Sequence, residues 1–129
     1  MTLSRTILIL GLLFLISGCA STTSHGTDGR ALTLLRPKDQ SLSRGGTNKV
    51  LVTVERDGFS GPIAIEFEDL PDGVRVIEED PQVPADDYFQ NFTFYVEDNA
   101  PVVSDHSIRI IATGPNGLEA VEHFQVDIS

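Results

Sequence analysis

The sequence predicts an all-β fold, a sandwich of about seven short antiparallel strands over residues 31–129. Three observations lead to this fold class. Apolar residues recur at every second position in several runs, and turn signals rich in Gly, Pro, Asn and Asp separate those runs. No segment after residue 30 carries the apolar stripe of an amphipathic helix. Each run therefore buries one face, and two sheets packed face to face would bury them all.

The first three expected strands cover residues 31–35, 47–56 and 62–68. The second follows an Arg-Gly-Gly turn, and the third follows a Ser-Gly-Pro turn. Val50, Val52 and Val54 are typical of the pattern, because they alternate with residues that would face away from the core.

The last four expected strands cover residues 74–78, 88–97, 106–113 and 118–128. The turn signals PDG, DNAP and GPNG precede the first, third and fourth of these strands. The stripe Phe92, Phe94 and Val96 places large apolar side chains on one face of the second.

Seven short strands in 99 residues, with turns at regular intervals, are expected of an immunoglobulin-like sandwich. The chain has no Trp and a single Cys, so the tryptophan and disulfide that mark antibody domains are absent. We therefore expect the architecture without membership of the antibody family. A domain of this size can fold on an aliphatic and aromatic core alone.

Residues 1–18 have the features of a secretory signal peptide. Arg5 and the amino terminus are positive, and the uncharged run TILILGLLFLI follows. Those eleven residues are too few for a membrane-spanning helix, which needs about 20.

The residues Ile16-Ser17-Gly18-Cys19 resemble the lipobox of bacterial lipoproteins, an aliphatic residue, a small residue, Gly or Ala, and an obligatory Cys. The resemblance implies cleavage between Gly18 and Cys19, a diacylglyceryl group on the Cys19 thiol, and an acyl chain such as palmitate on its new amine. Two or more acyl chains anchor a protein stably in a membrane. An ordinary signal peptide that contains a Cys, or a short uncleaved anchor, remains the alternative.

Residues 21–30 are polar and contain two glycines, so we expect residues 19–30 to form a lipidated flexible tether before the domain at 31–129. His25 would be a solvated residue of that tether. In the lipoprotein family, Asp directly after the Cys favours retention in the inner membrane. Ala20 stands there, so the resemblance implies an extracytoplasmic protein, in the outer membrane if the cell has two membranes.

The chain is strongly acidic, with 19 acidic and 9 basic residues and a formal charge of −10. Without residues 1–18 the charge becomes −11, because Arg5 is lost. Such a charge repels polyanions, so we expect no nucleic-acid partner and, for the domain as a whole, repulsion from anionic membranes. One cysteine excludes an intramolecular disulfide and a multi-cysteine zinc site.

The segment VLVTVERDGFSGPIAIEFEDLPDGVRV is similar to the Ig-like repeats of large bacterial secreted and cell-surface proteins. An arginine closes the second strand there too, and an LPxGV motif follows the third. Those repeats are mostly spacers or adhesive modules, so the resemblance implies a non-enzymatic binding or structural module with a protein or glycan partner. It implies no site.

Acidic residues on both sides of the loop PQVPA could supply oxygen ligands to Ca²⁺. The weak candidates are Glu78, Glu79, Asp80, Asp86 and Asp87. Solvated loop acids are the default interpretation, because neighbouring residues of an extended chain point in different directions. The loops leave open a calcium-dependent carbohydrate binder or a small hydrolase.

Two further groups of residues contain the chemistry of a hydrolase. Glu66 and Glu68 would share a strand face, about 6.5 to 7 Å apart, a separation that glycosidase carboxylates can show. Ser104-Asp105-His106 holds the residue types of a triad, but three neighbours on a strand cannot meet. We assign no catalytic residue.

The expected function is that of a membrane-anchored envelope lipoprotein with a non-enzymatic Ig-like module. Its only expected attached group is the lipid on Cys19. A further alternative is an accessory subunit of an envelope complex, docked through an edge strand at residues 31–35.

Overall fold

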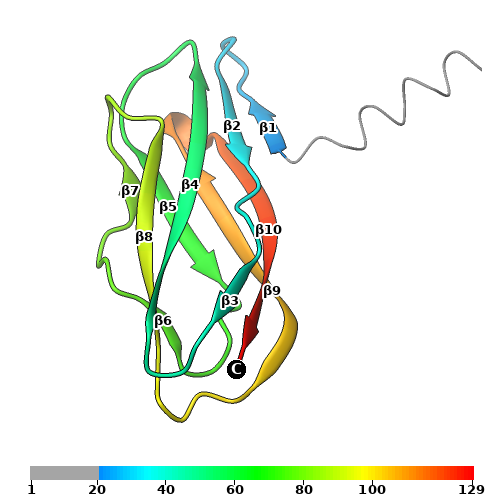
Figure 1. Ribbon diagram of the computed structural model, residues 1–129. Coiled ribbons are helices and arrows are strands. Elements are labelled where there is room, and N and C mark those ends of the chain that lie inside the picture. Colours follow the sequence, from blue (N-terminus) through cyan, green and yellow to red (C-terminus); the bar gives the residue numbers. More distant parts are fainter. Residues whose placement is uncertain (1–20) are drawn as a thin grey trace, which may run out of the picture.

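The structure is a computed structural model that describes residues 21–129 (Figure 1). The expected signal peptide, the cleavage site and Cys19 lie outside the described residues. Two five-stranded sheets pack face to face and form the expected all-β sandwich.

The first sheet has the strand order β1-β2-β4-β8-β6. Its strands are β1 (Ser21–His25), β2 (Ala31–Leu35), β4 (Thr47–Asp57), β8 (Phe89–Val96) and β6 (Val74–Val76). The second sheet has the order β3-β10-β9-β5-β7. Its strands are β3 (Gln40–Leu42), β10 (Glu119–Ile128), β9 (Val103–Thr113), β5 (Ile63–Glu68) and β7 (Gln82–Val83), with the short 3₁₀ helix η1 (Pro115–Gly117) before β10.

This strand order is that of an immunoglobulin-like fold. Strands β2, β4, β8 and β6 occupy the places of A, B, E and D, and β5, β9 and β10 occupy those of C, F and G. The pairs are antiparallel except for β3 and β10, which run parallel where the chain crosses from the first sheet to the second.

The strand count is ten, so the expectation of about seven was wrong by three. The seven expected runs correspond to β2, β4, β5, β6, β8, β9 and β10, with small shifts at their ends. The three strands that the sequence did not predict have two to five residues each; they are β1, β3 and β7. Their pairing depends on an edge offered by a neighbouring strand, which a short polar segment does not reveal.

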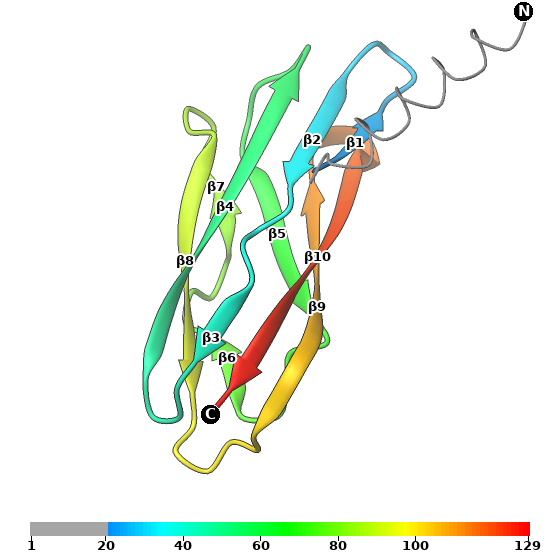
Figure 2. The same ribbon diagram turned by 45° about the vertical axis from the view of Figure 1, so that its right-hand side comes forward.

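Strand β1 occupies residues for which we expected a flexible tether. Its five residues pair antiparallel with all of β2, from Ser21 opposite Leu35 to His25 opposite Ala31 (Figure 2). The Oγ1 atoms of Thr23 and Thr33 lie 2.7 Å apart. Because β1 covers it, β2 is an interior strand of its sheet, so the expected edge at 31–35 is wrong and β1 is the edge.

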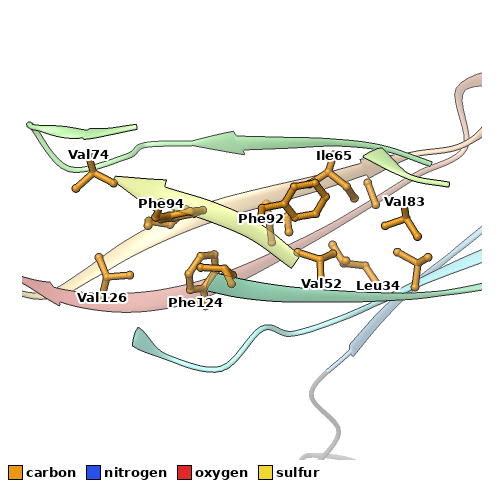
Figure 3. Close-up of a cluster of buried hydrophobic side chains, with 14 of the residues drawn as sticks. Leu34, Val52, Ile65, Val74, Val83, Phe92, Phe94, Phe124 and Val126 are labelled. Carbon is orange, nitrogen blue, oxygen red and sulfur yellow. The ribbon is translucent and has the colours of Figure 1, made fainter. Parts of the chain in front are cut away.

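The core lies between the sheets and consists of aliphatic and aromatic side chains, as the alternating pattern predicts (Figure 3). Phe92 and Phe94 of β8 and Phe124 of β10 are almost completely buried. Phe67 of β5 meets all three rings edge to face, with centroid distances of 5.0 to 6.4 Å. Such arrangements add about 0.5 to 1.5 kcal/mol per pair to the effect of burial.

Candidate functional site

Glu78, a calcium candidate, is held by strand β8. The Thr93 backbone N–H donates to one carboxylate oxygen at 2.9 Å, and the Thr93 hydroxyl donates to the other at 3.1 Å. Burial raises the pKa of Glu78, but these hydrogen bonds, one from its own N–H and the attraction of Lys49 outweigh burial. The pKa of Glu78 therefore lies below its usual value of 4.5. The role of this carboxylate is structural, because it connects its loop to β8.

Arg56 organises the loop that carries Asp86 and Asp87. Its guanidinium, at the end of β4, donates to four backbone carbonyls across two loops. The acceptors are the oxygens of Gly61 at 2.8 Å, Val83 at 3.3 Å, Pro84 at 2.8 Å and Asp87 at 2.6 Å. The arginine that closes this strand is therefore a structural clamp on the acidic loop.

The five calcium candidates do not form a cluster. Within residues 21–129 no group of three or more His, Cys, Asp and Glu side chains is placed to hold a metal ion. Glu79, Asp80, Asp86 and Asp87 are exposed on the loops around β7. The structure therefore gives the calcium hypothesis no shared coordination centre.

The hydrolase candidates are also separated. Glu68 forms an ion pair with Arg109 of the adjacent strand β9, while Glu66 is exposed. The His106 ring bonds the backbone oxygen of Asp69 at 2.6 Å, and the Asp105 N–H donates to Asp127 at 2.7 Å. Both bonds run to residues outside the proposed triad, so Ser104-Asp105-His106 does not form one.

A groove opens where β2 leaves the first sheet. Strand β2 pairs with β4 only as far as Leu34 opposite Val54, and the chain then crosses to the second sheet to form β3. Residues 47–53 of β4 pair with β8 on one side and face this crossover on the other. The hollow between β4 and the crossover has a volume of about 350 Å³. We call it the basic groove; its principal lining residues are Leu35, Arg36, Lys38, Lys49, Leu51 and Thr53.

Both lysines of the chain line this groove, together with one of its seven arginines. Arg36 forms an exposed ion pair with Asp39 at 3.1 Å. Among residues 21–129 neither Lys38 nor Lys49 forms an ion pair, although Lys49 lowers the pKa of Glu78 across β8. The groove is thus a cationic site on an acidic domain.

Exposed apolar side chains lie on the outer face of the same sheet. Leu51 of β4 is 49 % exposed and lies between the buried Val50 and Val52, and Phe89 at the start of β8 is 50 % exposed. Tyr88 is 64 % exposed and meets Phe89 edge to face at 5.6 Å. Exposed aromatic side chains of this kind are enriched at protein interfaces.

A second hollow, of about 390 Å³, lies between the β1–β2 hairpin and η1. It is bordered by His25, Asn116 and the ion pair of Asp28 with Arg30, whose atoms lie 2.8 Å apart. Its walls are two surface turns, so the hollow presents no converging reactive groups.

Sequence reasoning missed the basic groove, because its residues come from two segments with no motif in common. One signal was available. The only two lysines of the chain are 11 positions apart, one on the segment that crosses between the sheets and the other on β4.

No protein-family model and no curated protein sequence matches this chain. Among solved structures it is similar to a chimeric titin Z1Z2 functionalized with an exogenous KLER peptide from decorin. The sequence identity is 12 % and the TM-score is 0.45, over 76 % of this chain and 93 % of the titin chain. The order of the strands in the two sheets identifies the immunoglobulin-like fold independently of this similarity.

Over residues 21–129, the structure contains no helix of the length and apolar character needed to cross a membrane.

Proposed function

We propose that this protein is a lipid-anchored envelope lipoprotein whose Ig-like domain is a non-enzymatic binding module. Cys19 carries the lipid and residues 1–18 are its signal peptide. The protein faces an extracytoplasmic compartment, at the outer membrane where the cell has two membranes.

The observation that carries the proposal is the short distance between the lipobox and the domain. The first sheet begins at Ser21, two residues after Cys19. Two extended residues span at most about 7 Å, so a lipid on Cys19 holds the sandwich directly against the bilayer. A module in that position presents its sheets and loops to partners at the membrane surface.

The anchor is tested by incorporation of labelled palmitate in a bacterial host. We expect label in the wild type, none in Cys19→Ser, and label retained in Ser17→Ala, which keeps a small residue in the lipobox. Globomycin, which inhibits the lipoprotein signal peptidase, should make the wild-type precursor accumulate. An unlabelled wild type with no accumulated precursor contradicts the proposal.

The exposed Tyr88–Phe89 pair favours a second candidate function, an accessory subunit of an envelope protein complex. A photo-crosslinking residue placed at Phe89 should then give one discrete protein adduct in whole cells. The matched control is the same residue at Gln82 of β7, which is exposed on the edge strand of the other sheet. Identical adducts from both positions, or none from Phe89, contradict an interface at this face.

A further inference from the structure

We infer that the basic groove lies on the anchoring bilayer and binds the phosphates of anionic phospholipid headgroups. The lipid on Cys19 and the groove would then hold the domain in one orientation. The inference rests on the proposed function, because it requires the lipid anchor.

The pairing of β1 with β2 places the groove close to the anchored end of the domain. Ser21 lies opposite Leu35, the last residue of β2 and the first of the groove. Antiparallel partners have Cα atoms about 5 Å apart. Two residue steps, at most about 7 Å, separate Cys19 from Ser21, so chain length alone limits the distance between the Cα atoms of Cys19 and Leu35 to about 12 Å. A lipid on Cys19 thus enters the bilayer beside the groove.

The chemistry of the groove suits a phosphate-bearing surface. Lys38 and Lys49 are exposed on opposite walls of the groove, and Arg36 lies two positions before Lys38 on the crossover. Asp39 partly offsets Arg36 through the ion pair at 3.1 Å, which leaves the two lysines as the main cations. Each basic residue near an anionic membrane contributes about 1 kcal/mol to binding, a factor of about five.

The groove also contains apolar surface. Leu51 lies between the lysine and threonine positions of β4 and is 49 % exposed. Lysine stems can lie along apolar surface while the ammonium group reaches the headgroups. A leucine beside two lysines therefore fits the boundary between headgroups and acyl chains.

The opposite edge of the sandwich is acidic. Strands β6 and β7 are the far edges of their sheets, and the exposed Glu79 and Asp80 lie on the segment between them (Figures 1 and 2). The Glu78 carboxylate of the same segment instead reaches back to Thr93 of β8. Seating the groove on an anionic surface therefore directs the Glu79 and Asp80 carboxylates away from it. The net charge of −11 repels the free domain from such a surface, so the groove acts only when the anchor holds the domain there.

The test measures how fast the two lysines react when the full chain is anchored. Lipidated protein purified from membranes is reconstituted into vesicles of phosphatidylethanolamine and phosphatidylglycerol, treated with a water-soluble amine acylating reagent, and analysed by peptide mass spectrometry. The variant Arg75→Lys places a reference amine on β6, the far edge of the same sheet. In these vesicles we expect Lys38 and Lys49 to react at least about fivefold more slowly than this reference amine. In detergent, without a bilayer, we expect all three amines to react at the same rate.

Charge variants separate binding from simple proximity to the bilayer. Arg36→Gln should reduce the protection of the lysines about fivefold, whereas Arg44→Gln, the same charge change on the β3–β4 turn, should leave it unchanged. Vesicles of phosphatidylcholine alone should give little protection. Equal protection in both kinds of vesicle, or in both variants, overturns the assignment to anionic headgroups.

The remaining outcomes also decide the matter. Protection in native membranes that is absent from vesicles of purified protein identifies an acidic protein as the occupant and overturns the lipid. An acylated Cys19 with unprotected lysines overturns this inference and leaves the proposed function intact. A Cys19 without an acyl group in the same spectra overturns both.

Discussion

Two charged side chains of this domain form hydrogen bonds with its own backbone. The sequence offered Arg56 as part of a strand-end motif and Glu78 as a calcium candidate. In the structure the Arg56 guanidinium donates hydrogen bonds to backbone carbonyls of two loops. The Glu78 carboxylate accepts hydrogen bonds from the middle of β8. Such hydrogen bonds are charge-assisted and stronger than those between neutral groups.

Replacing Arg56 with Ala should lower the free energy of unfolding by about 2 to 4 kcal/mol, because four carbonyl acceptors lose their donor. Arg56→Lys should recover only part of this, since an ammonium group lacks the planar fork. Urea unfolding of the two variants measures the difference. The control is Arg75→Ala. The Nε atom of Arg75 lies 4.0 Å from its nearest carboxylate oxygen, so this substitution should lower the free energy of unfolding much less. Equal losses in the two alanine variants would contradict the clamp.

The lowered pKa of Glu78 predicts that the stability of the domain depends on pH. Its pKa in the folded domain lies below 4.5, its usual value in an unfolded chain, so folding favours the charged form. Its contribution is therefore present above pH 4.5 and is lost as the pH falls through the lowered folded pKa.

Glu78→Gln should accordingly be less stable than the wild type at neutral pH, and the difference should shrink in acid below pH 4.5. Urea unfolding across this range measures it. Glu79→Gln makes the same charge change at an exposed neighbour and should have little effect at neutral pH. A difference between Glu78→Gln and wild type that stays constant with pH would rule this account out.

At the scale of elements, β1 changes how the N-terminal part of the domain is understood. Its residues are polar and alternate between exposed and half-buried positions, because β1 is a sheet edge over β2. Thr22 donates a hydrogen bond of 2.6 Å to Glu122 of β10, which ties this edge to the second sheet. The composition of the segment is that of a linker, and its structure is that of a strand.

Amide hydrogen exchange distinguishes a strand from a tether. Ladder amides within Ser21–His25 should exchange at least about tenfold more slowly than those of Thr27 and Asp28 in the hairpin turn. Thr22→Ala should narrow this difference, since it removes the bond to Glu122. Exchange at turn rates throughout residues 21–25 would show that β1 does not form in solution.

At the scale of the whole molecule, the distribution of charge matters more than its sum. The acidic loops flank the far edges β6 and β7, while both lysines lie near the edge β1, beside which the chain enters the sheet. The overall charge of −11 predicts that the free domain does not bind polyanions, yet it conceals a local cationic groove.

Calcium should leave the stability of the domain unchanged, since the candidate carboxylates do not share a centre within residues 21–129. A site filled at 100 times its dissociation constant would add about 2.7 kcal/mol and raise the melting midpoint by several degrees. Melting scans with Ca²⁺ and with EDTA should therefore superimpose. A higher midpoint in Ca²⁺ would revive the calcium-dependent alternative.

The sequence by itself determined the parts of this protein that depend on local periodicity. Alternating Val, Ile and Phe predicted seven of the strands and the core between two sheets, since side chains on a strand alternate with period two. The lipobox assignment of Cys19 is a sequence prediction and stays one. Only the tertiary structure decided that residues 21–25 form an edge strand, that Arg56 and Glu78 bind backbone, and that two lysines meet in one groove. These features depend on which strands become neighbours, and that is fixed by long-range pairing that no local pattern encodes.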